Sequence, residues 1–322
     1  MAGHGADFQR DADWLYELYA ERRYDEALDL VLGLRDRYPD RDAQIGFFEA
    51  CLRSVRGQTE AAMELFRSGL DRGQWWRPEP LHTDPDLEPL RHDPRFIEIV
   101  EESARRAERA AAEGRPELRL LEPAAPSGTV VMALHGGSAN AEEFAPNWAA
   151  AAATGALVAV PQSPVPSFPG GQTFWWTSPP EVARQLREHM ATIRGAGHRA
   201  DRLVLGGISQ GARTALWCAV HAEPKPAVGV IAVAGAADLD AVTPALPAAA
   251  ARGLRVWFLT GDRDFVLPAI ERTRAAFDEA GIETRLTVVP GVGHAFPPDF
   301  DARLPELLDF VLGRTARTGE PR

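Results

Sequence analysis

The sequence contains little cysteine and no cluster of basic residues, and both shortages narrow the possible functions. Its only cysteines among 322 residues, Cys51 and Cys218, fall in segments assigned below to different domains, and neither has a neighbour typical of a metal or redox site. A reducing cytoplasm would leave such a pair as free thiols. Since phosphates bind surfaces rich in lysine and arginine, a net charge of −11 without a basic cluster argues against nucleic acid as a partner.

Long hydrophobic runs are also missing. The longest, Ala227–Ala237, is about half of the roughly 20 residues that a membrane-spanning helix requires, and its valine and isoleucine favour a buried strand. The first residues, Met1–Trp14, carry charged side chains and lack the apolar core of a secretory signal. We therefore expect a soluble, cytoplasmic protein without membrane insertion.

The patterns that are present change near residue 114. Up to that point apolar residues recur at three- and four-residue intervals, which predicts helices. Beyond it, short runs rich in valine, isoleucine and leucine alternate with helical stretches, as in βαβ units with a parallel sheet. We predict a helical domain over residues 1–114, a linker over 114–126, and an α/β domain over 115–322 with a doubly wound, mostly parallel sheet covered by helices on both faces.

The helical region carries a weak internal repeat. The segments Tyr24–Ala27 and Thr59–Ala62 both resemble the second helix of a tetratricopeptide hairpin, at a spacing close to that family's period. A further helix is predicted from Pro94, with Asp93 as its N-cap. Three roles stay open for this domain: packing, a groove for a protein partner or self-association, and a wall over the active site. The Trp75–Trp76 turn could line such a wall, although a paired tryptophan is more often interdomain core.

The most informative motif is Gly207-Ile208-Ser209-Gln210-Gly211. It follows the buried strand predicted at 203–208 and precedes a helix predicted at 212–221, so Ser209 lies on a strand-to-helix turn. A turn of this kind holds a serine hydroxyl above the sheet, and glycines on either side remove side chains that would block it. Ser209 is therefore the predicted nucleophile of a serine hydrolase.

A serine hydroxyl needs a base to take its proton and a carboxylate to orient that base. The strand predicted at 254–260 runs into a loop with two acids, of which we favour Asp264 over Asp262 because Asp264 is far enough along to point back over the sheet. Asp238 and Asp240, after the preceding strand, are a less favoured alternative. The last predicted strand, 284–289, is followed by His294, the expected base.

The transition state also requires backbone N–H donors for the developing oxyanion. One is expected from Gln210, directly after the nucleophile at the start of its helix. The other is expected from the glycine-rich loop 135–140, which follows the strand predicted at 129–134. His135 itself is interpreted as a structural loop residue.

These motifs together resemble the phospholipase/carboxylesterase branch of the α/β-hydrolases, close also to the dienelactone-hydrolase-like enzymes, over about residues 118–313. The resemblance implies a catalytic triad of Ser209, Asp264 and His294, with Gly137 and Gln210 forming the oxyanion hole. The chain departs from the family at Ser138 and Ala139, where relatives have glycine followed by aspartate or asparagine. The helical domain is not part of the family's minimal form.

Aromatic residues beside these motifs are candidates for contacting the substrate. Trp175 and Trp176 end a Pro/Gly/aromatic loop at the edge of the sheet where ligands bind in this architecture, and they either line a pocket or pack beneath the loop. Phe265 and Phe296 flank the acid and the base. The expected substrate is a small-molecule carboxylic ester or thioester, with a peptidase or amidase, and a non-catalytic scaffold that binds a partner, as alternatives.

No metal or organic cofactor is expected. Triad chemistry requires none, and four possible ligands fit a turn-rich connector better than a metal site because prolines separate them. These four are His82, Asp84, Asp86 and His92.

Overall fold

The computed structural model describes residues 2–314, which form two compact units. The helical unit comprises the residues up to Arg115 together with Pro164–Trp175, and the sheet unit comprises Pro116–Ser163 and the residues from Trp176 onward. The sequence prediction placed every residue after 114 in the second domain. The segment Pro164–Trp175, called the inserted segment below, departs from that prediction because it packs with the helical unit: Phe168 contacts that unit's core.

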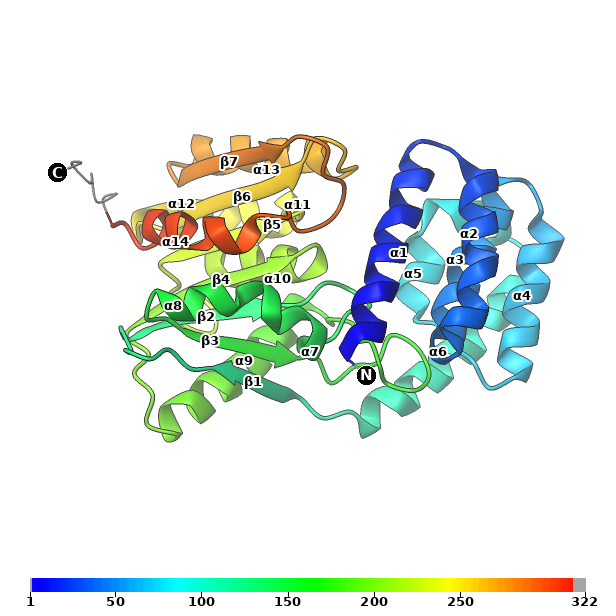
Figure 1. The fold of residues 1–322 in the computed structure, drawn as a ribbon, viewed down its shortest axis with the longest axis horizontal. Helices are drawn as coiled ribbons and strands as arrows, with labels where there is room; N and C mark the ends of the chain where they lie inside the picture. The colour runs from blue at the N-terminus through cyan, green and yellow to red at the C-terminus, as the bar shows by residue number, and fades with distance from the viewer. Residues whose placement is uncertain (1, 315–322) are drawn as a thin grey trace. The chain divides into compact units, whose positions relative to one another are not determined.

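The helical unit is built from successive helices whose neighbours pack against one another (Figure 1). The two segments that resemble tetratricopeptide helices, Tyr24–Ala27 and Thr59–Ala62, are the first turns of two helices. As predicted, Asp93 caps the helix that starts at Pro94, by accepting a hydrogen bond from the N–H of Arg95. The resemblance to tetratricopeptide hairpins stays a prediction. The elements are α1 (Ala2–Ala20), α2 (Tyr24–Arg37), η1 (Pro39–Arg41), α3 (Asp42–Val55), α4 (Thr59–Asp71), α5 (Pro78–Thr83), η2 (Pro85–Leu90) and α6 (Pro94–Glu113).

Trp76 belongs to the helical unit's own core. Its side chain is fully buried, its ring packs edge-on against Phe66 at a centroid distance of 4.9 Å, and its indole N–H donates to the carbonyl of Ala43 at 2.8 Å. A buried indole with its N–H satisfied inside the same unit is a packing residue of that unit. For Trp76, this corrects the interpretation of the Trp75–Trp76 turn as interdomain core or as the wall of a site.

A seven-stranded sheet forms the centre of the sheet unit, in the order β1-β3-β2-β4-β5-β6-β7. All neighbouring pairs are parallel except β1 and β3. The edge strand β1 lies inside residues 114–126, predicted as linker; it is short and only partly buried, so its apolar pattern gave little signal. The strands are β1 (Glu117–Leu121), β2 (Thr129–Leu134), β3 (Leu157–Gln162), β4 (Arg202–Ile208), β5 (Gly229–Val233), β6 (Arg255–Gly261) and β7 (Glu283–Val289).

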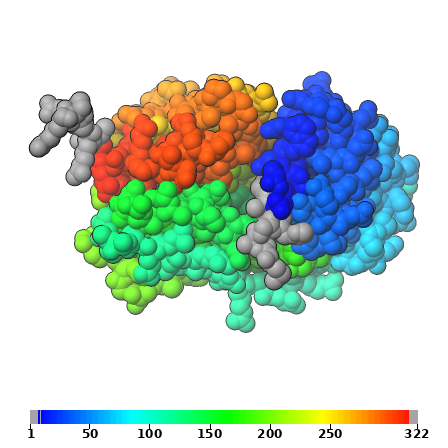
Figure 2. All heavy atoms as spheres, in the orientation of Figure 1, coloured from blue at the N-terminus to red at the C-terminus, as the bar shows by residue number. Residues whose placement is uncertain are grey.

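Helices cover both faces of the sheet, as predicted. Side chains alternate along β2, so that Val130 and Met132 join one core layer while Val131 joins the other. The first layer includes α9, α10, α12 and α13, and the second includes η3, α8 and α14, the last two in front of the sheet in Figure 1 and side by side in Figure 2. The elements are α7 (Ala141–Phe144), η3 (Ala145–Trp148), α8 (Ala149–Ala153), α9 (Pro179–Gly195), α10 (Gln210–Val220), α11 (Leu239–Val242), η4 (Thr243–Ala245), α12 (Leu246–Ala251), α13 (Leu267–Glu279) and α14 (Phe300–Val311).

This topology brings the predicted functional loops to one edge of the sheet. The parallel strands β2, β4, β6 and β7 run in one direction, so the loops at their carboxyl ends emerge together. These loops carry His135, Ser209, Asp264 and His294. Among residues 2–314, no helix is both long and apolar enough to cross a membrane.

Candidate active site

Ser209 lies in a strained turn between β4 and α10. Its backbone has φ +54° and ψ −118°. A positive φ of this kind costs a non-glycine residue free energy and persists only where the surrounding structure imposes it. Those surroundings include a hydrogen bond from its N–H to the carbonyl of Val233 at 2.9 Å. At Gly211 a Cβ atom would lie 2.2 Å from the carbonyl oxygen of Leu134, so only glycine allows the helix to start so close to β2.

His294 joins Ser209 to Asp264. Its Nε2 lies 2.9 Å from the hydroxyl oxygen of Ser209, and its Nδ1 lies 2.9 Å from Oδ1 of Asp264. An ionised carboxylate only accepts hydrogen bonds, so Nδ1 carries the proton and Nε2 is left to accept from the serine hydroxyl. The structure thus brings the three residues into a continuous chain of hydrogen bonds.

Asp264 is held by two donors besides His294. Thr260 donates its hydroxyl proton to Oδ2 at 2.6 Å, and the N–H of Val266 donates to Oδ1 at 2.9 Å. Burial alone would raise the pKa of Asp264, but the hydrogen bonds from His294, Thr260 and Val266 and the charge of His294 outweigh it and hold this pKa below its usual range. Asp264 is therefore an anion at neutral pH.

The other acids considered from the sequence are not hydrogen-bond partners of His294. Asp262 is exposed and accepts a hydrogen bond from the N–H of Gly291 at 2.7 Å, which fixes the loop before His294. Asp238 is the N-cap of α11, and Asp240 is exposed on that helix's first turn. Of the acids weighed, Asp264 is the one that contacts the histidine.

The glycine-rich loop after β2 lies close to Ser209. A Cβ atom placed on Gly136 would be 3.9 Å from the Cβ of Ser209, so even a small side chain at position 136 would touch that serine. Ser138 continues the turn with φ +57°. Gln210 provides the first N–H of α10, which has no partner within its own helix. The two predicted donor segments thus lie on either side of Ser209.

His135 is buried behind this loop, and its hydrogen bonds go to residues other than Ser209, Asp264 and His294. Its Nδ1 lies 2.7 Å from the carbonyl oxygen of Gly136, while its Nε2 faces two donors, the side-chain amide of Gln162 at 3.2 Å and the N–H of Ser163 at 3.4 Å. Burial lowers the pKa of His135 to about 4, although the bond to Gly136 opposes this shift. The ring is therefore neutral, with its proton on Nδ1.

The four aromatic residues proposed as substrate contacts occupy different positions. Phe265 is 66% exposed, and its ring lies 4.7 Å from the imidazole of His294. Phe296 packs against Phe300 at 4.7 Å in the core layer beneath the site. Trp176 is only 1% exposed and stacks on His135, so it packs beneath the loop. Trp175 belongs to the inserted segment.

The possible metal ligands of the connector do not gather as a set. Within the described residues, Asp84 and Asp86 group instead with Cys51, their ligand atoms lying within 4.8 Å of one another. The Tyr19 hydroxyl donates to Asp86, and the Cys51 thiol lies 3.9 Å from Asp84. Burial raises the pKa of both carboxyl groups. These contacts describe a cluster of hydrogen-bonded side chains.

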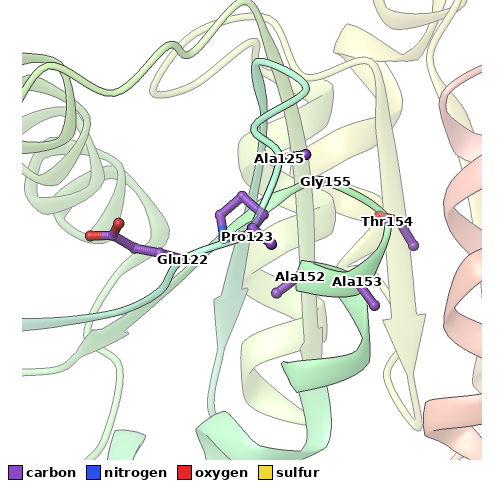
Figure 3. Close-up of a pocket in the computed structure, with 8 residues that line it drawn as sticks. Glu122, Pro123, Ala125, Ala152, Ala153, Thr154 and Gly155 are labelled. Atoms are coloured by element: carbon purple, nitrogen blue, oxygen red, sulfur yellow. The ribbon is translucent and has the colours of Figure 1, made fainter.

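A cavity of about 400 Å³ lies at the edge of the sheet opposite the loops that carry Ser209, Asp264 and His294. Figure 3 shows the residues that line it. It is formed by the chain that leaves β1 and by the end of α8 before β3, and Glu122 is its one ionisable lining residue. Its other lining residues are Pro123, Ala124, Ala125, Ala152, Ala153, Thr154 and Gly155. Apart from the Thr154 hydroxyl, these small and mostly apolar side chains offer no nucleophile, and they hold no acid–base pair.

Sequence reasoning missed two residues that support the site. Thr260, which binds Asp264, is the penultimate residue of the apolar strand β6, and Gln162, which binds His135, ends the apolar strand β3. In both cases the available signal was a polar residue at the carboxyl end of a buried parallel strand, at the edge where the functional loops gather.

The doubly wound, mostly parallel sheet has the α/β-hydrolase fold, and a strained serine on a strand-to-helix turn, joined through a histidine to a buried aspartate, lies at its carboxyl edge. Two family models match the sequence. The one described as "A/B hydrolase-like, N-terminal domain" matches residues 13–111, and the one described as "Phospholipase/Carboxylesterase" matches residues 180–310. Residues 180–310 thus carry the phospholipase/carboxylesterase pattern on an α/β-hydrolase fold, behind an N-terminal helical domain, which supports a hydrolase of the esterase type.

Solved structures are similar in fold. An uncharacterized protein from Bacillus cereus ATCC 10987 is 24% identical, with a TM-score of 0.52, and the match covers 94% of this chain and 98% of that one. Esterase PE8 is 21% identical, with a TM-score of 0.50, over 61% of this chain and 99% of that one. A search of curated proteins returned no match. At these identities the likeness shows the fold alone.

Proposed function

We propose that the protein is a serine esterase that hydrolyses a small carboxylic ester or thioester through an acyl-enzyme intermediate. The observation that carries the proposal is the pair of 2.9 Å contacts of His294, one to the hydroxyl of Ser209 and one to the carboxylate of Asp264. This is the hydrogen-bond chain that activates a serine nucleophile.

In the first half of the reaction, Oγ of Ser209 attacks the carbonyl carbon while Nε2 of His294 takes the hydroxyl proton. The carbonyl oxygen becomes an oxyanion, which the N–H groups of Gly137 and Gln210 bind. The tetrahedral intermediate then expels the alcohol or thiol, and His294 returns the proton to it. What remains is an acyl group on Ser209.

In the second half, water replaces the departed alcohol. His294 takes a proton from the water, whose oxygen attacks the acyl carbon, and collapse of this second intermediate releases the acid and restores the Ser209 hydroxyl. The Asp264 anion stabilises the imidazolium in both halves, which is consistent with the hydrogen bonds that hold its pKa low. These steps require neither a metal ion nor an organic cofactor.

Ester and amide substrates would use the same groups, so the leaving group must be found by experiment. We expect purified full-length protein to hydrolyse p-nitrophenyl esters and acyl thioesters faster than peptide anilides, and Ser209→Ala to abolish this turnover. Preferential anilide turnover would favour a peptidase or amidase, and absence of any turnover would contradict the proposal. A partner-binding role of the helical unit and a cytoplasmic location stay predictions.

A further inference from the structure

The two donors of the proposed oxyanion hole come from different segments of the chain. Gly137 follows β2, and Gln210 begins α10. An oxyanion is stabilised only if both N–H groups point at one small volume, so their relative position has to be fixed before the substrate arrives. Trp176 lies in the loop that precedes α9; it is buried and hydrogen-bonds to both segments.

On the first segment, Trp176 holds His135 in two ways. Its indole N–H donates to the His135 carbonyl at 2.8 Å, and its ring stacks on the imidazole with centroids 4.6 Å apart and planes inclined by 27°. The side chain is 1% exposed, so this indole bond is shielded from competing water.

On the second segment, Trp176 and Gln210 exchange two hydrogen bonds. The backbone N–H of Trp176 donates to Oε1 of Gln210 at 3.1 Å, and Nε2 of Gln210 donates to the Trp176 carbonyl at 2.9 Å. This cyclic pair fixes the residue whose own N–H is the second proposed donor. The side chain of Gln210 is thus bound to Trp176, while its backbone faces the nucleophile's turn.

The orientation of His135 sets the direction of the first donor. The carbonyl of Gly136 and the N–H of Gly137 belong to one planar trans peptide and point in opposite directions. The His135 ring donates from Nδ1 to that carbonyl at 2.7 Å, so the ring determines where the Gly137 N–H points. The low pKa of His135, about 4, keeps the ring in the neutral form that makes this bond while Nε2 accepts from Gln162.

We propose that Trp176 is a positioning residue that fixes both donors of the oxyanion hole, one through His135 and the other through Gln210. This inference rests on the proposed esterase function. It assigns Trp176 to the support of the transition state, and of the two positions considered from the sequence it favours packing beneath the loop over lining the substrate pocket.

The test is Trp176→Phe, which keeps an aromatic ring against His135 and the backbone bonds to Gln210 but removes the indole donor. Trp257→Phe is the matched control, because Trp257 is 6% exposed in β6 and its indole donates to Thr287 at 3.0 Å, outside the donor network. Removing a whole oxyanion donor costs about 10²–10³ in kcat, so loosening one is expected to cost about tenfold. We expect KM to stay within about twofold, because the ground-state ester makes little use of these donors.

A second measurement separates positioning from general loss of structure. A trifluoromethyl ketone forms a tetrahedral adduct that uses the oxyanion hole, so its inhibition constant for Trp176→Phe should rise by the same factor as kcat/KM falls. If Trp176→Phe does not fold, Gln210→Leu tests the other contact, because it removes the side-chain bonds to Trp176 but keeps the backbone N–H. The same loss of kcat at constant KM is expected.

Several results would overturn the inference. If kcat of Trp176→Phe equals that of Trp257→Phe, the indole bond does not position the donors. If KM rises while kcat is unchanged, Trp176 contacts substrate instead. Failure of the proposed function gives a different result, because the unaltered protein would then neither hydrolyse esters nor form a covalent adduct with a fluorophosphonate.

Discussion

Replacing Asp264 by asparagine removes one charge from the site and leaves its shape almost unchanged. In the structure, Oδ1 of Asp264 accepts hydrogen bonds from the N–H of Val266 and from Nδ1 of His294, and Oδ2 accepts one from the hydroxyl of Thr260. The N–H of Val266 can only donate, whereas the Thr260 hydroxyl can rotate to accept. We therefore expect the asparagine oxygen to take the place of Oδ1, so that His294 keeps its proton on Nδ1.

The expected loss is then the electrostatic stabilisation of the imidazolium alone. Opposite charges roughly 4 Å apart at an effective dielectric of about 20 attract by about 4 kcal/mol. Since each ~1.4 kcal/mol is a factor of ten in rate, kcat should fall about 10³-fold. An asparagine turned the other way would force the proton to Nε2 of His294 and cost about 10⁴-fold, as known for such a change of tautomer.

The assay is steady-state hydrolysis of a p-nitrophenyl ester at pH 8 by Asp264→Asn and by Asp262→Asn as the matched control. Asp262 is exposed and bonds to Gly291, so its variant should retain kcat within about twofold of the unaltered protein. Activity of Asp264→Asn within tenfold of the unaltered protein would refute the electrostatic reasoning. An equal loss in both variants would refute the choice of acid.

Three further predictions concern stability, each measured by urea denaturation. Histidine has a pKa of about 6.5 in the unfolded chain and His135 has one of about 4 in the fold, so between pH 7 and 5 only the unfolded chain gains this proton. The free energy of unfolding of His135→Gln should therefore fall by about 2 kcal/mol less over that interval than that of the unaltered protein. Parallel pH profiles of the two proteins would contradict this. Gly211→Ala places a Cβ 2.2 Å from the Leu134 oxygen and should cost about 1–3 kcal/mol, against no change if the backbone yields freely. Thr260→Val leaves Oδ2 of Asp264 without its donor and should cost about 1.5–3 kcal/mol at pH 7, whereas Thr260→Ser should cost much less.

The strands and the loops that follow them could be predicted because buried parallel strands appear in a sequence as nearly continuous apolar runs. β2 spans the predicted residues, β4 and β7 each begin one residue earlier than predicted, and β6 spans 255–261 instead of 254–260. Parallel strands place their carboxyl ends at one edge, so Ser209, Asp264 and His294 were expected together without any knowledge of their distances. The preference for Asp264 over Asp262 rested on the same geometry.

What the sequence could not indicate depends on contacts between residues far apart in the chain. Whether Trp176 faces a pocket or packs inward is decided by His135 and Gln210, which lie 41 and 34 residues away. The inserted segment follows β3 directly, yet it packs with the helical unit through Phe168. Neither composition nor periodicity carries information on such long-range partners.

The central claim is that Ser209 is a nucleophile activated by His294. Its most direct test is the intact mass of the full chain after reaction with a fluorophosphonate, followed by peptide mapping of the adduct. We predict one adduct per chain, on the peptide that contains Ser209, absent in Ser209→Ala and formed far more slowly in His294→Ala. No adduct on the unaltered protein, or an adduct that persists in Ser209→Ala, would contradict the account.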